Sequence, residues 1–234
     1  MKKKLNQKLI NLIEYYNLLN ANLLLSNIPL KRSINNSITS VNGTKLKKLE
    51  KLKKNIQLIK NCDLKKNAKN LVFGDGNIEA KVMIVGEGPG AQEDLQSKPF
   101  VGRAGKLLDK MLEAIQLNRT KVYISNVVNY RPPQNRKPTE IEIERYLPYL
   151  KSHIEIINPK ILILLGSTAL NTLIGNEVVI SKARGKWIQK DIGTAKPWII
   201  ASFHPAFLMR QPDQKKMAWI DLKMVRDKLK SLRI

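Results

Sequence analysis

Four short runs of almost uniformly apolar residues constrain the fold of this chain more than any other feature of its sequence. The runs are Ala80–Val85, Val122–Val128, Lys160–Leu165 and Trp198–Phe203. Strands that are covered on both faces lack the alternation of apolar and polar residues that half-exposed strands show. Helical patterns separate or follow the runs, at Gly105–Ile115, Thr139–Ile157, Thr168–Ile174 and Asp213–Leu232. This order of elements predicts an α/β fold built around a parallel sheet.

The first 55 residues differ from the rest and are expected to form a basic helical amino-terminal extension, which leaves residues 56–234 as the main domain. Apolar side chains recur at helical spacing at Leu5, Leu9, Leu12, Ile13 and Tyr16. Polar residues interrupt this stretch and no small-residue cleavage site follows, so we expect an amphipathic helix and not a secretory signal. A second, strongly basic helix is expected over residues 44–60.

The balance of charge favours a polyanionic partner. The chain has 42 Lys and Arg against 19 Asp and Glu, a net charge of +23, and such an excess is typical of nucleic-acid-binding proteins. Part of it can reflect AT-rich codon use. The single cysteine, Cys62, excludes an intrachain disulfide and fits a reducing compartment. No apolar run approaches the roughly 18 residues of a membrane helix. We therefore expect a cytoplasmic monomer without membrane contact.

A glycine-rich loop follows the first apolar run. It reads Gly86-Glu87-Gly88-Pro89-Gly90 and leads through Glu93 and Asp94 to the segment KPFVGRAG at residues 98–105. Glycines let backbone amides approach a ligand closely. The loop lacks the GK[ST] ending of a phosphate-binding loop, and Pro89 and the acidic residues do not suit a pyrophosphate. Glycines, carboxylates and one aromatic residue, Phe100, better suit a flat, uncharged ring.

Polar side chains also follow the second and fourth runs. Asn126 has a side-chain amide with both a donor and an acceptor, as needed to read one edge of a base. His204 follows the fourth run. Candidate contacts to DNA phosphates and stacked bases are Arg131, Arg136, Lys137, Phe207, Leu208, Arg210 and Lys215. Ligands of open α/β sheets bind beyond the carboxyl ends of the strands, so we expect one common site.

Five segments, in their order and spacing, resemble the family 4 uracil-DNA glycosylases. They are GEGPGAQED, KPFVGRAG, YISNVVNYRPPQNRKPT, PKILILLG and SFHPAFLMR. The resemblance covers residues 57 to 225. It implies a three-layer α/β/α sandwich around a four-stranded parallel sheet. It also implies hydrolysis of the N-glycosidic bond of a flipped-out deoxyuridine in uracil-containing DNA, the first step of base-excision repair.

The resemblance further implies a role for each residue of the site. Phe100 stacks on uracil and Asn126 binds its Watson–Crick edge, while Gly86, Gly88, Pro89 and Gly90 complete the pocket. His204 stabilises the negative charge that collects on the departing base. Either Glu87 or Glu93 handles the water and favours the cationic sugar. Glu93 is preferred of the two, on the expectation that loop amides hold Glu87.

The chain departs from its family at the iron–sulfur cluster. Most members hold a [4Fe–4S] cluster through four cysteines, and the corresponding positions here are Ile59, Cys62, Tyr130 and Tyr146. Such clusters need thiolate ligands, so we expect no metal and no cofactor. We also expect Tyr130 and Tyr146 to meet as aromatic filling.

Two other functions stay open from the sequence. One is removal of a different deaminated base, against which Asn126 argues. The other is a non-catalytic or weakly active DNA-binding relative that has lost its cluster. The joint presence of both glutamates, Phe100, Asn126 and His204 favours catalysis, because a protein that only binds DNA has no use for water-handling carboxylates. A nucleotide-binding domain is disfavoured, because a phosphate loop is missing.

Overall fold

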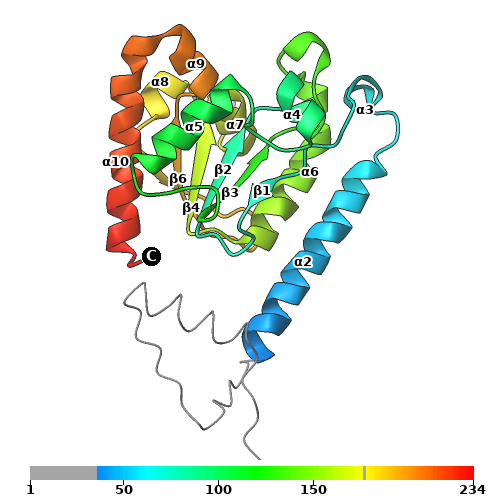
Figure 1. Cartoon of the computed structure of the whole chain (residues 1–234), viewed down its shortest axis with the longest axis horizontal. Helices are drawn as coiled ribbons and strands as arrows, with labels where there is room; N and C mark the ends of the chain where they lie inside the picture. Colours follow the sequence, from blue (N-terminus) through cyan, green and yellow to red (C-terminus); the bar gives the residue numbers. More distant parts are fainter. Residues whose placement is uncertain (1–35, 176–177) are drawn as a thin grey trace, which may run out of the picture. The chain divides into compact units, whose positions relative to one another are not determined.

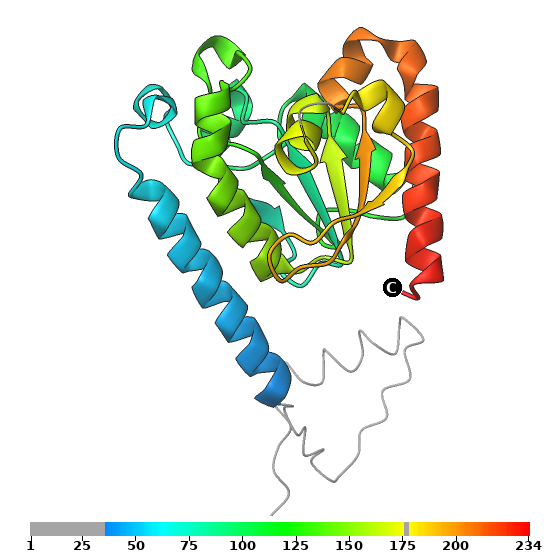
Figure 2. The same ribbon diagram turned by 180° about the vertical axis from the view of Figure 1, so that it is seen from behind.

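The computed structural model describes residues 36–175 and 178–234, and its compact unit runs from Ser40 to Ile234. Figures 1 and 2 show this part of the chain as a sheet with helices on both faces. The helix expected around residues 5–16 lies outside the described residues. Within the described part, no helix is both long and apolar enough to cross a membrane.

A mixed sheet forms the centre, with the strand order β1-β3-β2-β4-β6-β5 within the described residues. The strands are β1 (Asp75–Gly76), β2 (Val82–Gly86), β3 (Val122–Asn126), β4 (Ile161–Leu165), β5 (Trp187–Gln189) and β6 (Trp198–Ser202). The neighbouring strands β3, β2, β4 and β6 are parallel, which confirms the predicted four-stranded core. The edge strands β1 and β5 are antiparallel, and at two and three residues they are too short to leave a pattern in the sequence.

Helices cover both faces of the sheet and complete the predicted three layers. They are α2 (Asn36–Gln57), α3 (Asp63–Asn67), α4 (Ala91–Gln96), α5 (Arg103–Glu113), α6 (Glu140–Ile157), α7 (Ser167–Leu173), α8 (Ile180–Ala183), α9 (Pro205–Arg210) and α10 (Lys215–Ser231). Alternate residues of β2 face opposite cores, as strands buried on both faces require. Met83 and Val85 pack with the core beneath α2, α6 and α7, whereas Val82 and Ile84 pack with the core beneath α5 and α10.

The basic helix expected over residues 44–60 is α2, which begins eight residues earlier, at Asn36, and ends at Gln57. Its side chains Leu49, Leu52 and Ile56 are buried in the core that α6 shares. Burial of about three such aliphatic side chains is worth several kcal/mol, which fixes this part of α2 on the domain. The division at residue 55 stays a prediction.

Candidate active site

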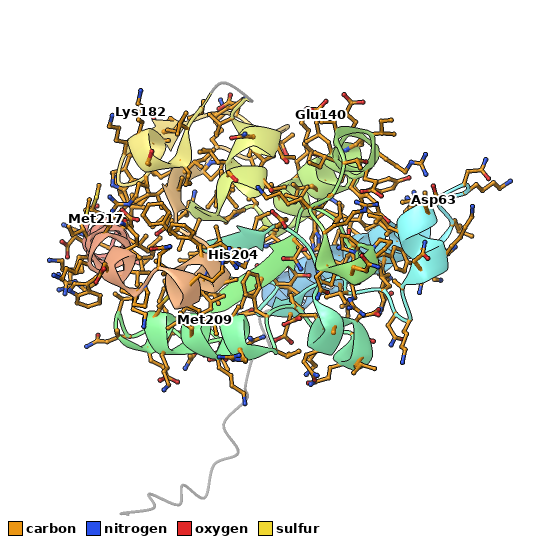
Figure 3. All side chains as sticks on the ribbon, turned by 90° about the horizontal axis from the view of Figure 1, so that it is seen from above. Asp63, Glu140, Lys182, His204, Met209 and Met217 are labelled. Atoms are coloured by element: carbon orange, nitrogen blue, oxygen red, sulfur yellow. The ribbon has the colours of Figure 1, made fainter. Side chains whose placement is uncertain are left out.

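The carboxyl ends of the parallel strands bring the expected residues to one edge of the sheet. Glu87 follows β2, Asn126 ends β3 and His204 follows β6, and Figure 3 shows His204 near the middle of this edge. A cavity of about 530 Å³ opens there. Residues on its wall include Glu87, Lys137, Gly166, Ser167, Phe203, His204, Phe207 and Arg210. Phe100 and Asn126 are instead buried beside it.

Asn126 and Phe100 converge on Gly86, which pairs with Asn126 in the β2–β3 register. A Cβ atom on Gly86 would lie 2.6 Å from Asn126 Oδ1 and 2.6 Å from the Phe100 ring, so only glycine fits there. Asn126 is buried, and its Oδ1 finds no hydrogen-bond partner among the residues that the structure describes. A buried acceptor without a partner costs about 1–3 kcal/mol. This atom is therefore free to accept a hydrogen bond from a ligand.

His204 occupies the N-cap of α9, directly before Pro205. Its Nδ1 accepts a hydrogen bond from the Ala206 amide at 3.2 Å, so a neutral ring carries its proton on Nε2. Burial, together with the nearby positive charge of Arg210, lowers the pKa of His204 to about 4. The ring centroid lies 5.4 Å from that of Phe100. His204 is thus a neutral hydrogen-bond donor beside the aromatic ring.

The two glutamates have different environments. Loop amides were expected to hold Glu87, but in the structure they hold Glu93. Loop amides hold Glu93: its carboxylate accepts from Gly90 at 3.1 Å, Val101 at 2.8 Å and Gly102 at 2.7 Å. Glu87 lines the cavity, and one of its oxygens accepts from the Thr168 hydroxyl. Three amide donors leave Glu93 little capacity to bind a water, whereas Glu87 retains it.

The loop that carries Phe100 is fixed from several sides. Phe100 has a φ of 54°, in the left-handed region that residues other than glycine rarely adopt. The Glu93 carboxylate accepts from the two backbone amides that follow Phe100. Arg119 donates to the Pro99 carbonyl at 3.0 Å and also to the Phe100 carbonyl. A Cβ atom on Gly105 would lie 1.8 Å from the Phe100 carbonyl oxygen. The ring is therefore held by its own backbone.

Arg119 was missed in the sequence analysis. It precedes β3 at the amino end of the strand, where no ligand is expected, and only the fold brings it to the Phe100 loop. Asp75 and Asp109 bind its guanidinium at 2.9 Å each, which orients it. A half-buried arginine that binds two main-chain carbonyls carries no signature in a single sequence.

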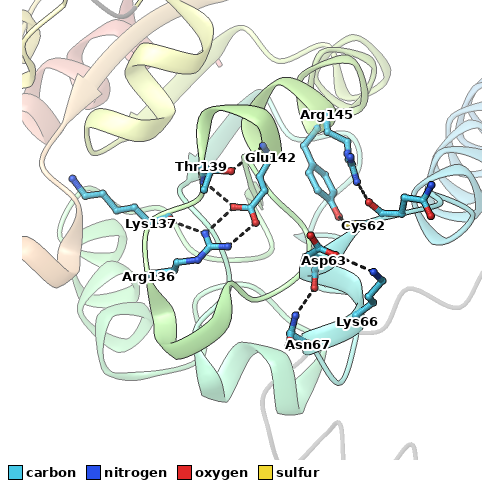
Figure 4. A network of polar contacts seen from close by, with 11 residues as sticks. Cys62, Asp63, Lys66, Asn67, Arg136, Lys137, Thr139, Glu142 and Arg145 are labelled. Carbon is cyan, nitrogen blue, oxygen red and sulfur yellow. Dashed lines mark hydrogen bonds and ion pairs between the residues drawn. The ribbon is translucent and has the colours of Figure 1, made fainter.

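The candidate DNA contacts fall into two groups. Lys137 and Arg210 line the cavity, and Lys215 is exposed at the start of α10. Arg136, in contrast, makes a two-pronged contact with Glu142 at 2.7 and 2.8 Å, shown in Figure 4. Arg131 donates to Asn135 at 2.8 Å. The pairing with Glu142 joins Arg136 to the first turns of α6, and the contact of Arg136 with DNA stays a prediction.

Leu208 does not fit the contact to stacked bases expected of it. It is 1% exposed and packs with Phe203 and Ala218 beneath α9. Because α9 faces the core with one side, Pro205 and Leu208, which are three residues apart, are its buried residues, and the composition of the segment does not reveal this. Phe207 is partly buried and is one of the apolar side chains that line the cavity.

The positions of the expected cluster ligands form a packed aromatic group. Cys62, Tyr130 and Tyr146 are all buried in one core, and Cys62 Sγ lies 3.4 Å from the Tyr146 hydroxyl. Burial raises the pKa of both tyrosines. Ile59 packs at the margin of this core. One thiol, two phenols and an aliphatic side chain do not fit a [4Fe–4S] cluster.

Iron content tests this arrangement directly. Protein purified without oxygen should be colourless and hold far less than one iron per chain, because three of the four positions lack a thiolate. Metal analysis and the visible absorption spectrum measure both. A broad absorption band with about four irons per chain would mean that other residues ligate a cluster.

Comparison with known proteins shows which family this chain belongs to. The family model described as "Uracil DNA glycosylase superfamily" matches residues 73–223. A type-4 uracil-DNA glycosylase of Thermotoga maritima is 45% identical over 150 residues, 64% of this chain and 77% of the relative. That of Archaeoglobus fulgidus is 38% identical over 77% of this chain and 92% of the relative. That of Pyrobaculum aerophilum is 43% identical over 69% and 86%.

Proposed function

Because this chain belongs to the type-4 uracil-DNA glycosylases of the uracil DNA glycosylase superfamily, we propose that it excises uracil from DNA by hydrolysing the N-glycosidic bond of a flipped-out deoxyuridine. The buried, unpartnered Oδ1 of Asn126 is the observation that carries the proposal within the described residues. It lies where the aromatic ring of Phe100 and the neutral imidazole of His204 also converge.

Uracil matches the polar groups of this site. Its N3–H donates to Asn126 Oδ1, and its O4 accepts from the amide nitrogen of the same side chain. The ring stacks on Phe100. The absence of a side chain on Gly86 lets Asn126 and Phe100 come together over its backbone. Bases are unreachable inside a duplex, so the nucleotide leaves the stack before it binds.

Bond cleavage places negative charge on uracil and positive charge on the sugar. His204 donates Nε2–H to the O2 side of the base, where the bond strengthens as the charge develops. Since the imidazole is neutral before the reaction, it stabilises the anion as a donor and does not supply a full positive charge. Its Nδ1 stays occupied by the Ala206 amide, which fixes the orientation of the ring.

Glu87 is the group that handles the water. Its carboxylate lies in the cavity, and Thr168 holds one of its oxygens. It accepts a proton from the attacking water and favours the cationic sugar. Glu93 and Arg119 are positioning residues, because they act through the backbone of the loop that carries Phe100.

The DNA strand that carries the uracil runs over the mouth of the cavity. Arg210, Lys137 and Lys215 bind its phosphates, and Phe207 contacts the bases next to the gap. Uracil-containing DNA is thus the partner, with no part for a membrane. The protein acts as a monomer in the cytoplasm.

Paired substitutions of the glutamates test the assignment. Glu87→Gln should lower single-turnover uracil excision by at least about 10²-fold, because it removes the general base of the reaction. It should leave the melting temperature unchanged, because no backbone amide of the described residues donates to the Glu87 carboxylate. Glu93→Gln should lower the melting temperature by several degrees, because its amide nitrogen cannot accept from the loop. The measurements are excision at saturating protein and thermal unfolding. Full activity of Glu87→Gln would mean that a group other than Glu87 handles the water.

A further inference from the structure

Helix α2 has one face buried in the domain and an opposite face that carries lysine. Leu49, Leu52 and Ile56 point into the core. Residues 43–57 contain six lysines and one glutamate. Lys47, Lys51 and Lys54 follow one another at spacings of four and three residues, are exposed, and therefore form a single outward stripe. The stripe spans about 10 Å of the helix.

The lysines of the stripe do not support the fold. Lys45, on the same helix, turns inward and binds Glu79 at 2.8 Å and the Ile157 carbonyl at 3.1 Å. Lys47, Lys51 and Lys54 make no hydrogen bond or ion pair with any residue that the structure describes. Lysines four apart also repel each other on a helix. The lysines of the stripe therefore repel one another, and a bound polyanion would reduce this repulsion.

The charge continues from α2 toward the catalytic edge of the sheet. Lys60 and Lys69 are exposed on either side of α3. The backbone amide of Lys69 donates to Asp94 of α4 at 3.0 Å, which ties this segment to the helix after the glycine-rich loop. Figures 1 and 2 show α3 and α4 at the same end of the sheet.

We propose that this lysine stripe, Lys47, Lys51 and Lys54, binds the phosphate backbone of DNA outside the catalytic cavity. It adds phosphate contacts that do not depend on the base at the site. The partner is a nucleic acid because the stripe offers point charges without an apolar pocket, and point charges are what a phosphate backbone needs. The inference rests on the proposed function only in taking DNA as the ligand.

The test compares two triple variants that lose the same charge. Lys47→Gln/Lys51→Gln/Lys54→Gln removes the stripe and keeps good helix formers. The matched control, Lys81→Gln/Lys160→Gln/Lys230→Gln, removes exposed lysines that lack partners among the described residues. Lys81 and Lys160 lie before β2 and β4, at the end of the sheet away from the catalytic edge. The dissociation constant for a uracil-free duplex is measured at several salt concentrations.

The stripe variant should bind this duplex more weakly, and its slope of log affinity against log salt should be shallower by about two to three. The control should keep the slope of the unaltered protein. Single-turnover excision at saturating protein should be equal in all three. Equal slopes for the two variants would overturn the proposal. Binding to uracil-free DNA is independent of excision, so a failure of the proposed activity would be seen separately.

Discussion

Replacing His204 with alanine should slow single-turnover uracil excision by about 10²–10³-fold, the typical effect of removing one donor to a developing anion. Binding of uracil-containing DNA should change little, because the hydrogen bond strengthens mainly in the transition state. Excision at saturating protein measures the first quantity, and a binding titration with a non-cleavable substrate measures the second. Unchanged excision would mean that His204 only caps α9 and has no part in catalysis.

The protonation state of His204 adds a second readout. Its pKa is lowered to about 4 by burial, so the ring is neutral in the folded protein at neutral pH. Excision at saturating protein should therefore not fall as the pH rises through the ordinary histidine value of roughly 6.5. The lowered pKa also makes the folded state less stable as the pH falls from about 6.5 toward 4, because unfolded chains bind the proton first. A loss of rate between pH 6 and 7.5, at about the ordinary pKa, would contradict a neutral donor.

Asn126→Asp should lose most uracil excision, by about 10- to 100-fold or more. The substitution keeps the shape of the side chain but replaces the donor to O4 with an acceptor. A buried polar pair left unsatisfied costs about 1–3 kcal/mol, and about 1.4 kcal/mol corresponds to a factor of ten. Two opposed acceptors in the desolvated pocket add repulsion. Single-turnover cleavage of matched oligonucleotides measures the loss.

Cytosine provides the matched substrate for this variant. It presents an acceptor at N3 and a donor at N4, the reverse of uracil. A carboxylate accepts from the N4 amino group, and a protonated carboxyl also donates to N3. Slow cytosine excision by Asn126→Asp would therefore support the reading role further. Unimpaired uracil excision by the variant would remove that role from Asn126, whatever happens with cytosine.

The parallel core was predictable because its strands are buried on both faces. β2, β3, β4 and β6 each consist of five residues, almost all of them buried. Such continuous apolar runs are distinct even in a single sequence. The rule that ligands bind at the carboxyl ends of parallel strands then placed Glu87, Asn126 and His204 at one edge, and the structure brings them there.

The environments of the glutamates were not predictable, because they depend on a loop that folds back. Glu93 meets Val101 and Gly102 only when the segment after α4 turns at Phe100 in the left-handed region. Arg119 completes this turn from the start of β3. The burial of Leu208 likewise depends on which side of α9 packs against Phe203. Spacing along the chain constrains none of these contacts.

Cleavage of DNA that contains a single uracil is the decisive measurement of the proposed activity. Purified protein is incubated with an end-labelled oligonucleotide, and abasic sites are then cut with alkali. Cutting is expected at the uracil position alone, in the presence of a chelator, and none is expected with the matched oligonucleotide that has thymine there. His204→Ala should show the cut much more slowly. Intact uracil-containing DNA after long incubation with folded, DNA-binding protein would show that this protein does not excise uracil.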